Sequence, residues 1–190
     1  MMSETSDAVT PTGLLADRER EGSGGWCPLE RALGVVGTRS AMLLVREGFY
    51  GARRFDQLAR RAGITETVTA KRLRALVGIG VFERVPYREA GQRTRHEYVL
   101  TDMGRALFPV LASLMNWGDS YLADASGGIS WTHSGCGAGI EPRVRCAEGH
   151  DVAIGETSAV ATIATRRPDR AADRKPARDE AGREERQGES

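Results

Sequence analysis

Cysteine is scarce in this chain of 190 residues, in which only Cys27, Cys136 and Cys146 carry a thiol. So sparse and odd a set excludes a small domain held together by disulfides. Long apolar runs are also lacking, as is the pattern of a secretory signal peptide, so we expect a cytoplasmic protein with no membrane contact. In that compartment thiols stay reduced unless they sense oxidants or bind a metal.

Periodic apolar residues are missing from both ends of the chain. Residues 1–25 are rich in Ser, Thr, Gly and charge, and residues 166–190 contain no aromatic or β-branched side chain. Segments of this composition bury too little apolar surface to fold alone. We therefore predict a disordered arm at 1–25, a disordered mixed-charge tail at 155–190, and one domain of ordinary size between them.

A large net charge is lacking too, but the charges that make up the total of +1 are segregated. Residues 26–100 hold 14 basic and 7 acidic side chains, whereas residues 101–165 hold 3 and 7. A positive segment beside a negative remainder is typical of a protein that binds nucleic acid through one face. The charge pattern therefore favours a nucleic-acid binder.

The stretch 55–84 predicts two helices that meet at a tight turn. Apolar residues recur at helical spacing until Gly63 interrupts the pattern. Thr65 or Thr67 then offers a hydroxyl N-cap for a second periodic run, which Gly80 closes. This arrangement is a helix-turn-helix, in which the second helix can enter the major groove of DNA.

The predicted outward face of the second helix has short side chains near its start and basic side chains further along. Short side chains allow close approach to base edges, and basic ones reach phosphates or guanine. This chemistry suits double-stranded DNA, although two amphipathic helices joined by a glycine also occur in many protein cores. The face opposite Leu73 and Leu76 carries Thr65, Glu66, Thr67, Ala70, Lys71 and Arg74.

A β-hairpin is predicted directly after this helix. Residues 81–85 and 97–100 have strand character and flank a polar loop. A hairpin in this position is a wing, whose basic side chains can reach the DNA backbone or the minor groove. The candidates on the wing are Arg88, Arg93 and Arg95, and Arg54 is a further candidate just before the first helix of the pair.

Two more helices are predicted before the helix-turn-helix. Pro28 suits the first turn of a helix that follows Cys27, and Leu29, Leu33 and Val36 mark its buried side. Ser40 opens a second helix whose dense apolar stripe predicts a buried central position.

A long apolar helix is predicted after the hairpin. Thr101 is its N-cap, Pro109 should kink it, and its pattern continues to Leu122. A small domain cannot cover so much apolar surface alone. Because helix-turn-helix proteins commonly bind paired half-sites, the surplus face predicts the interface of a two-fold homodimer.

Taken together, the chain from Trp26 to Leu122 resembles the HxlR-type winged helix-turn-helix transcriptional regulators, which are related to the MarR type. The resemblance implies a mainly α fold with a small β-hairpin wing (α+β), and a homodimer formed through the first and last helices that binds operator DNA. We further expect a transcription regulator, most simply a repressor, with no cofactor and with a small-molecule effector or thiol oxidation as the candidate signals. The matching motifs are Cys27, Arg54-Phe55 with Leu58, Ile64, Arg72-Leu73 with Leu76, the segment GIGVFER, Tyr98-Val99-Leu100-Thr101 with Gly104, and Trp117-Gly118.

A segment rich in cysteine and histidine, residues 125–154, follows the predicted DNA-binding domain at 26–124. It resembles the C-terminal appendix of some members of this group, although the last cysteine of their pattern is missing. His133, Cys136, Cys146 and His150 are chemically suited to a tetrahedral zinc site. The alternative function is a small metal- or thiol-dependent enzyme built on the same four residues, which would need a cysteine beside a base in a shaped pocket.

Cys27 is the candidate for thiol sensing. The resemblance places it where redox-sensing members of the group carry their reactive thiol. Its position just before a helix that starts at Pro28 is near the positive end of the helix dipole, which favours the reactive thiolate. Glu30 opposes that effect, and packing at a subunit interface is the alternative role of this residue.

Overall fold

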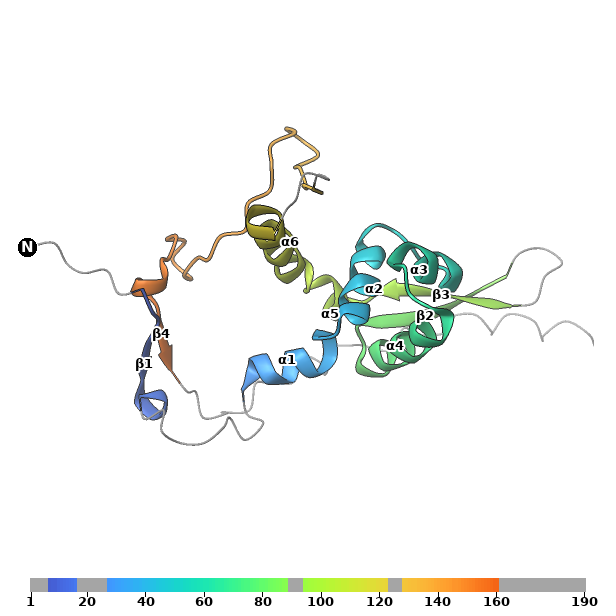
Figure 1. Ribbon diagram of the computed structural model, residues 1–190, viewed down its shortest axis with the longest axis horizontal. Coiled ribbons are helices and arrows are strands. Elements are labelled where there is room, and N and C mark those ends of the chain that lie inside the picture. The colour runs from blue at the N-terminus through green and yellow to red at the C-terminus, as the bar shows by residue number, and fades with distance from the viewer. Residues whose placement is uncertain (1–6, 17–26, 89–93, 123–127, 161–190) are drawn as a thin grey trace, which may run out of the picture. The chain divides into compact units, whose positions relative to one another are not determined.

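The computed structural model describes residues 7–16, 27–88, 94–122 and 128–160 of the chain. These described residues fall into two compact units, one within 1–20 and 153–190 and the other within 21–152. The larger unit contains the helices α1 to α6 and the hairpin β2–β3 (Figure 1). No helix among the described residues is long and apolar enough to cross a membrane.

The larger unit has the winged helix-turn-helix architecture that the sequence predicted. The strands β2 and β3 are antiparallel, with Phe82 opposite Leu100 and Tyr87 opposite Arg95. They run beside α3 and α4 and project beyond them (Figure 1). The elements in chain order are α1 (Pro28–Val36), α2 (Arg39–Phe49), α3 (Phe55–Ala62), α4 (Glu66–Ile79), β2 (Phe82–Tyr87), β3 (Arg95–Leu100), α5 (Asp102–Arg105) and α6 (Phe108–Leu122).

Capping residues explain where the helices begin and end. Thr38 and Thr65 each accept a hydrogen bond from the N–H three residues on, at 3.2 and 3.4 Å. Gly63 and Gly80 end α3 and α4 with φ of 63° and 92°, a conformation that residues with a Cβ rarely adopt. The predicted turn at Gly63 and cap at Thr65 are confirmed, and α2 begins one residue before Ser40.

The hydrophobic core lies between α2, α3, α4 and the base of the hairpin. Helix α2 is the central helix, as predicted, since its inner face is buried and it packs against both α3 and α4. One polar contact ties it to α4, because Arg72 Nε donates to Ser40 Oγ at 3.1 Å. The core residues are Leu44, Val45, Ala52, Leu58, Ala62, Leu73, Leu76, Val81, Phe82 and Leu100.

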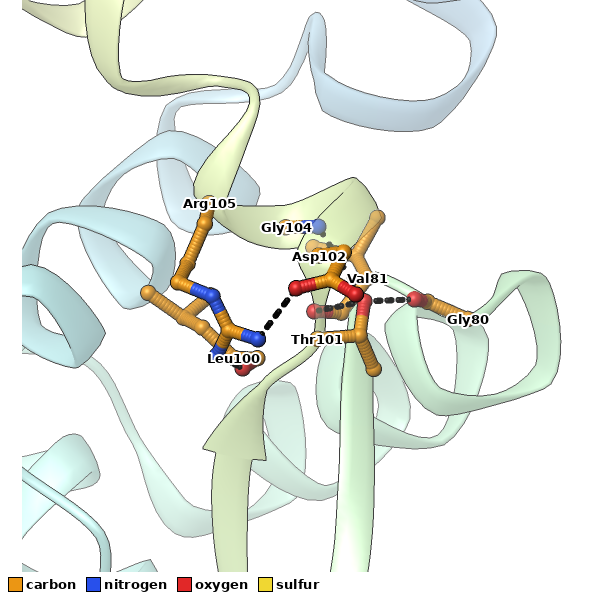
Figure 2. Close-up of polar contacts among 7 residues, drawn as sticks. All are labelled: Gly80, Val81, Leu100, Thr101, Asp102, Gly104 and Arg105. Atoms are coloured by element: carbon orange, nitrogen blue, oxygen red, sulfur yellow. Dashed lines mark hydrogen bonds and ion pairs between the residues drawn. The ribbon is translucent and has the colours of Figure 1, made fainter. Parts of the chain in front are cut away.

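Thr101 joins the end of the hairpin to the helices on both sides. Its side chain donates to the carbonyl oxygen of Gly80 and accepts the N–H of Gly104 at 3.1 Å, and its own N–H donates to the Val81 carbonyl at 3.2 Å (Figure 2). Arg105 adds a further link, because its guanidinium bonds both the Leu100 carbonyl and the Asp102 carboxylate. This cluster fixes the exit of β3 against the exit of α4.

Gly104 leaves no room for a side chain in this cluster. A Cβ built on it would lie 2.2 Å from the carbonyl oxygen of Val81 and 2.9 Å from a methyl carbon of Leu100. We expect Gly104→Ala to lower the free energy of unfolding by about 1–3 kcal/mol, because backbone must move to relieve the overlap. Gly78→Ala is the matched control, since nothing lies within 4 Å of its added Cβ. In α4 that change should stabilise by about 0.5–1 kcal/mol. Equal denaturation midpoints for the two variants would contradict this packing.

Two features of the terminal helices differ from the sequence prediction. The expected single helix after Thr101 is interrupted, and α6 starts at Phe108, so that Pro109 lies in its first turn, where a missing N–H costs little. Of the three residues predicted to be buried on α1, Val36 is buried, but Leu29 and Leu33 are 64% and 54% exposed. The single chain therefore leaves uncovered the first two turns of the helix face that the apolar pattern marked as buried.

The smaller unit contains a short parallel pair of strands. Residues Thr10–Thr12 (β1) pair with Ser158–Val160 (β4), and the short turns η1 (Gly13–Leu15) and η2 (Ile154–Glu156) lie next to them. The sequence predicted no element in either segment. The other residues of the predicted arm and tail lie mostly outside the described ranges, so the proposed division into domains stays a prediction.

Candidate nucleic-acid interface

The turn between α3 and α4 presents α4 with one face buried and the other exposed. Leu73 and Leu76 are each 1% exposed and anchor the helix in the core. Thr69 is also buried, and its hydroxyl donates to the Thr65 carbonyl at 2.9 Å, so this polar side chain is satisfied within the helix. The orientation of α4 is thus fixed by its inner face.

The outer face of α4 holds the residues that the sequence singled out. Lys71 and Arg74 are exposed and lie one helical turn apart. Ala70, which precedes them, is half-buried. Thr65, Glu66 and Thr67, at the first turn, are exposed as well. The face therefore offers hydroxyl and carboxylate groups at its N-terminal end and two cations further along.

A basic cleft of about 310 Å³ lies between the start of α3 and the part of the wing strands nearer the loop. The guanidinium of Arg54 lies 5.1 Å from the centroid of the Tyr87 ring, a cation–π contact that holds this cation beside the wing. Three arginines face one carboxylate here, and the N-terminus of α3 adds partial positive charge. The lining residues are Arg54, Phe55, Asp56, Arg84, Tyr87, Arg95, His96 and Tyr98.

The wing is tied to α3 by backbone as well as side-chain contacts. The Tyr98 N–H donates to the Arg53 carbonyl at 2.8 Å, and Arg53 lies 3.8 Å from the carboxylate of Glu97. At the start of α3, Gln57 Oε1 accepts the N–H groups of Arg53 and Arg54 at 3.3 and 3.4 Å. These bonds hold the cleft walls in a fixed relation.

The sequence found part of this cleft and missed the rest. Arg54 and Arg95 line it, and Arg88 is exposed just after β2, whereas Arg93 lies outside the described residues. Arg84, Tyr87 and His96 were not predicted. Their signal was weak, because only the strand register, which the sequence did not give, places Arg84 and Tyr87 of β2 across from Tyr98 and Arg95 of β3 and His96 beside them.

The cysteine and histidine candidates occupy other positions. Cys27 is the N-cap residue of α1 and is partly buried, and its side chain makes no capping hydrogen bond. His133 Nδ1 lies 3.3 Å from Cys136 Sγ, and His150 Nδ1 lies 3.5 Å from Cys146 Sγ. Among the described residues, no three His, Cys, Asp or Glu side chains gather in a group that could hold a metal. The predicted set of four therefore forms two separate pairs.

The fold, the exposed face of α4 and the basic cleft together define a winged helix-turn-helix transcription regulator. Residues 35–126 match the family described as HxlR-like helix-turn-helix. A relative from Mycobacterium bovis, the HTH-type transcriptional regulator Mb3122, is 48% identical over 117 residues, which cover 61% of this chain and 73% of the relative. The chain belongs to the HxlR-like helix-turn-helix family.

Two solved structures are also similar. The crystal structure of PA1607, a candidate transcription factor, shares 35% identity with a TM-score of 0.64 and covers 72% of this chain and 95% of its own. The structure of PA1374 from Pseudomonas aeruginosa, another candidate transcription factor, shares 29% identity with a TM-score of 0.53 and covers 74% and 95%. The similarity extends over the DNA-binding fold and is consistent with the family.

Proposed function

We propose that this transcription regulator binds a two-fold operator in the cytoplasm as a homodimer and acts as a repressor. The observation that carries the proposal is that the chain has both an exposed polar and basic face on α4 and an arginine-lined cleft between the start of α3 and the wing. In this proposal α4 reads bases in the major groove, with Thr65, Glu66, Thr67, Ala70, Lys71 and Arg74 on the reading face. A dimer bound over promoter DNA would exclude the polymerase.

The wing and the cleft supply sequence-independent affinity in this proposal. Arg54, Arg88, Arg93 and Arg95 contact phosphates, and the N-terminus of α3 points partial positive charge at the same backbone. In the proposed division of the chain, 26–124 binds DNA and dimerises, 125–154 is the Cys/His appendix, and 1–25 and 155–190 flank them. Removal of the last segment should leave DNA binding intact.

The test of the proposal is a mobility shift with the DNA upstream of the protein's own gene across a salt series. Affinity should fall steeply as salt rises, because each phosphate contact releases counterions. Arg95→Ala should weaken binding to all sequences alike and lower the slope of log affinity against log salt by about 1. Arg143→Ala, which removes the same charge from the appendix, should leave the slope unchanged. A loss confined to one operator sequence would contradict a backbone contact at Arg95.

We also propose that release from the operator follows a small-molecule effector or oxidation of Cys27. Cys27 is the N-cap of α1, whose exposed Leu29 and Leu33 belong to the proposed subunit interface, so a bulkier or polar sulfur there would disturb that interface. Peroxide would oxidise the thiol to a sulfenic acid while being reduced to water.

The expected result is that mild peroxide releases wild-type protein from its operator in a mobility shift while a folded, dimeric Cys27→Ser variant stays bound. Cys136→Ser, which keeps Cys27, is the matched control and should respond like the wild type. Identical release of the wild type and Cys27→Ser would leave Cys27 with a packing role.

A further inference from the structure

Two small loops of similar design follow the long helix. The first is closed by a bridge between Thr132 and Gly139, and the second by a bridge between Arg145 and Asp151. Each contains one tight turn with a glycine at positive φ, Gly137 at 73° and Gly149 at 87°. The chain therefore repeats one local structure twice within residues 132–151.

Backbone hydrogen bonds define both turns. In the first loop the N–H groups of Cys136 and Gly137 donate to the His133 carbonyl, at 3.2 and 2.8 Å. In the second, the Gly149 N–H donates to the Cys146 carbonyl at 3.0 Å, and the Cys146 N–H donates to the His150 carbonyl at 3.0 Å. In both loops the turn brings the side chains of one histidine and one cysteine together.

The separation within each pair is that of two ligands on one metal ion. Nδ1 and Sγ lie 3.3 Å apart in the His133 and Cys136 pair, and 3.5 Å apart in the Cys146 and His150 pair. With Zn–N near 2.05 Å and Zn–S near 2.3 Å, two ligand atoms on a tetrahedral zinc lie roughly 3.6 Å apart. Both pairs thus already have the spacing for chelation, and all four side chains are exposed.

We propose that the two loops are the halves of one zinc site, in which His133, Cys136, Cys146 and His150 bind a single tetrahedral ion. Two thiolates neutralise the charge of Zn²⁺, and two neutral imidazoles complete the coordination. The nine residues 137–145 between the pairs, three of them Gly or Ala at 137–139, allow the loops to close on the ion. Because the two pairs are separate in the described structure, zinc draws them together.

The neighbouring charges favour this set over other ligands. The Asp151 carboxylate, next to His150, is bound by Arg145 at 2.6 Å and approached by Arg143 at 3.7 Å. Glu141 is likewise paired with Arg143 at 2.8 Å. Glu141 and Asp151 are therefore engaged by arginines, which favours the thiols and imidazoles over these two carboxylates as ligands.

The site is attached to the DNA-binding domain through an aromatic cluster. Trp131, directly before the first loop, stacks on Phe108 of α6 with ring centroids 5.0 Å apart and planes at 9°, and meets the Tyr50 ring edge-on at 6.2 Å. The Ile140 N–H also donates to the Trp131 carbonyl at 2.9 Å. The two loops that would bind zinc are therefore anchored, through Trp131, to the end of α2 and the start of α6.

The chain provides its own controls, because one of its three cysteines, Cys27, and one of its three histidines, His96, lie outside the two loops. Reduced, metal-free full-length protein is titrated with Co²⁺, followed by displacement with Zn²⁺. We expect one ion per chain, visible bands of tetrahedral cobalt, thiolate-to-cobalt charge transfer, and release of protons from the thiols. These readouts do not depend on DNA, so they are independent of the proposed function.

Loss of a residue that only supports a metal ligand lowers metal affinity roughly 10–100-fold. Loss of a ligand itself should cost more, so we expect a larger drop in zinc affinity for each of the variants Cys136→Ser, Cys146→Ser, His133→Ala and His150→Ala. Cys27→Ser and His96→Ala should keep the wild-type stoichiometry and spectrum. Two ions per chain, one ion per two chains, or an unchanged spectrum in either appendix cysteine variant would overturn the proposal. A circular dichroism spectrum identical to wild type shows that a variant which fails to bind has kept its fold.

Discussion

Replacing Leu73 by alanine is expected to lower the free energy of unfolding by about 2–5 kcal/mol, because this side chain is 1% exposed in the core between α2, α3 and α4. Replacing Arg74, its neighbour in sequence, is expected to change stability by less than about 0.5 kcal/mol, because Arg74 is exposed. Urea denaturation of the two variants measures the contrast directly.

The effects on DNA binding should be the reverse: substitutions on the exposed face of α4 should weaken binding, whereas Leu73→Ala should not. Arg74→Ala and Lys71→Ala should each weaken operator binding by about 1–3 kcal/mol if they contact bases, and by a uniform, salt-dependent amount if they contact phosphates. Leu73→Ala should bind with near wild-type affinity at a temperature where it remains folded. Equal destabilisation by all three substitutions would mean that α4 presents a different face.

The elements around α4 were predictable because each end has a local chemical signal. Gly63 and Gly80 take left-handed conformations, and Thr65 and Thr101 cap the next helices with their hydroxyls. Such signals act over three or four residues and need no knowledge of the tertiary fold. The winged helix-turn-helix could therefore be derived from the sequence alone.

The helix after β3 shows where local signals are insufficient. Pro109 was expected to kink one long helix, but the chain forms the separate helices α5 and α6. The short α5 is held by contacts distant in sequence, since Thr101 bonds the Gly80 carbonyl and Gly104 packs against Val81. A pattern of apolar residues along one segment does not reveal such contacts.

The basic cleft was only half predicted for a similar reason. Arg54 and Arg95 were named from their positions beside the helix pair and on the wing, whereas Arg84 and His96 become neighbours only through the pairing of β2 with β3. Residues Arg84 and Tyr98 are opposite in that register. Register depends on both strands at once and is not encoded in either strand alone.

Apolar periodicity also cannot say which molecule covers a face. Leu29 and Leu33 have the spacing of core residues, yet they are exposed on α1. On α6 the inner residues Leu111 and Ala112 are buried, while an outer stripe of Val110, Leu114, Trp117 and Tyr121 is exposed at helical spacing. Exposed stripes of this size on two helices are typical of a surface that another chain covers.

The second large effect is expected from a charge in that stripe. Leu114 is 52% exposed near its centre, so Leu114→Glu should leave the fold intact but place a carboxylate, and its symmetry mate, inside the proposed dimer interface. Sedimentation at micromolar concentration should report about twice the chain mass of 20.6 kDa for the wild type and the single chain mass for Leu114→Glu.

Loss of the dimer should carry a large loss of operator affinity. Two linked DNA-binding domains bind a two-fold site more tightly than one domain alone by a factor of roughly 10²–10⁴, because the second contact becomes intramolecular. Leu114→Glu should therefore lose that factor on a full operator and lose little on an isolated half-site. Asn116→Glu introduces the same charge on the same helix outside the stripe, and should stay dimeric and bind as the wild type does. A dimeric Leu114→Glu protein would place the subunit interface elsewhere, and a monomeric wild type that still binds the full operator tightly would remove the two-fold basis of recognition.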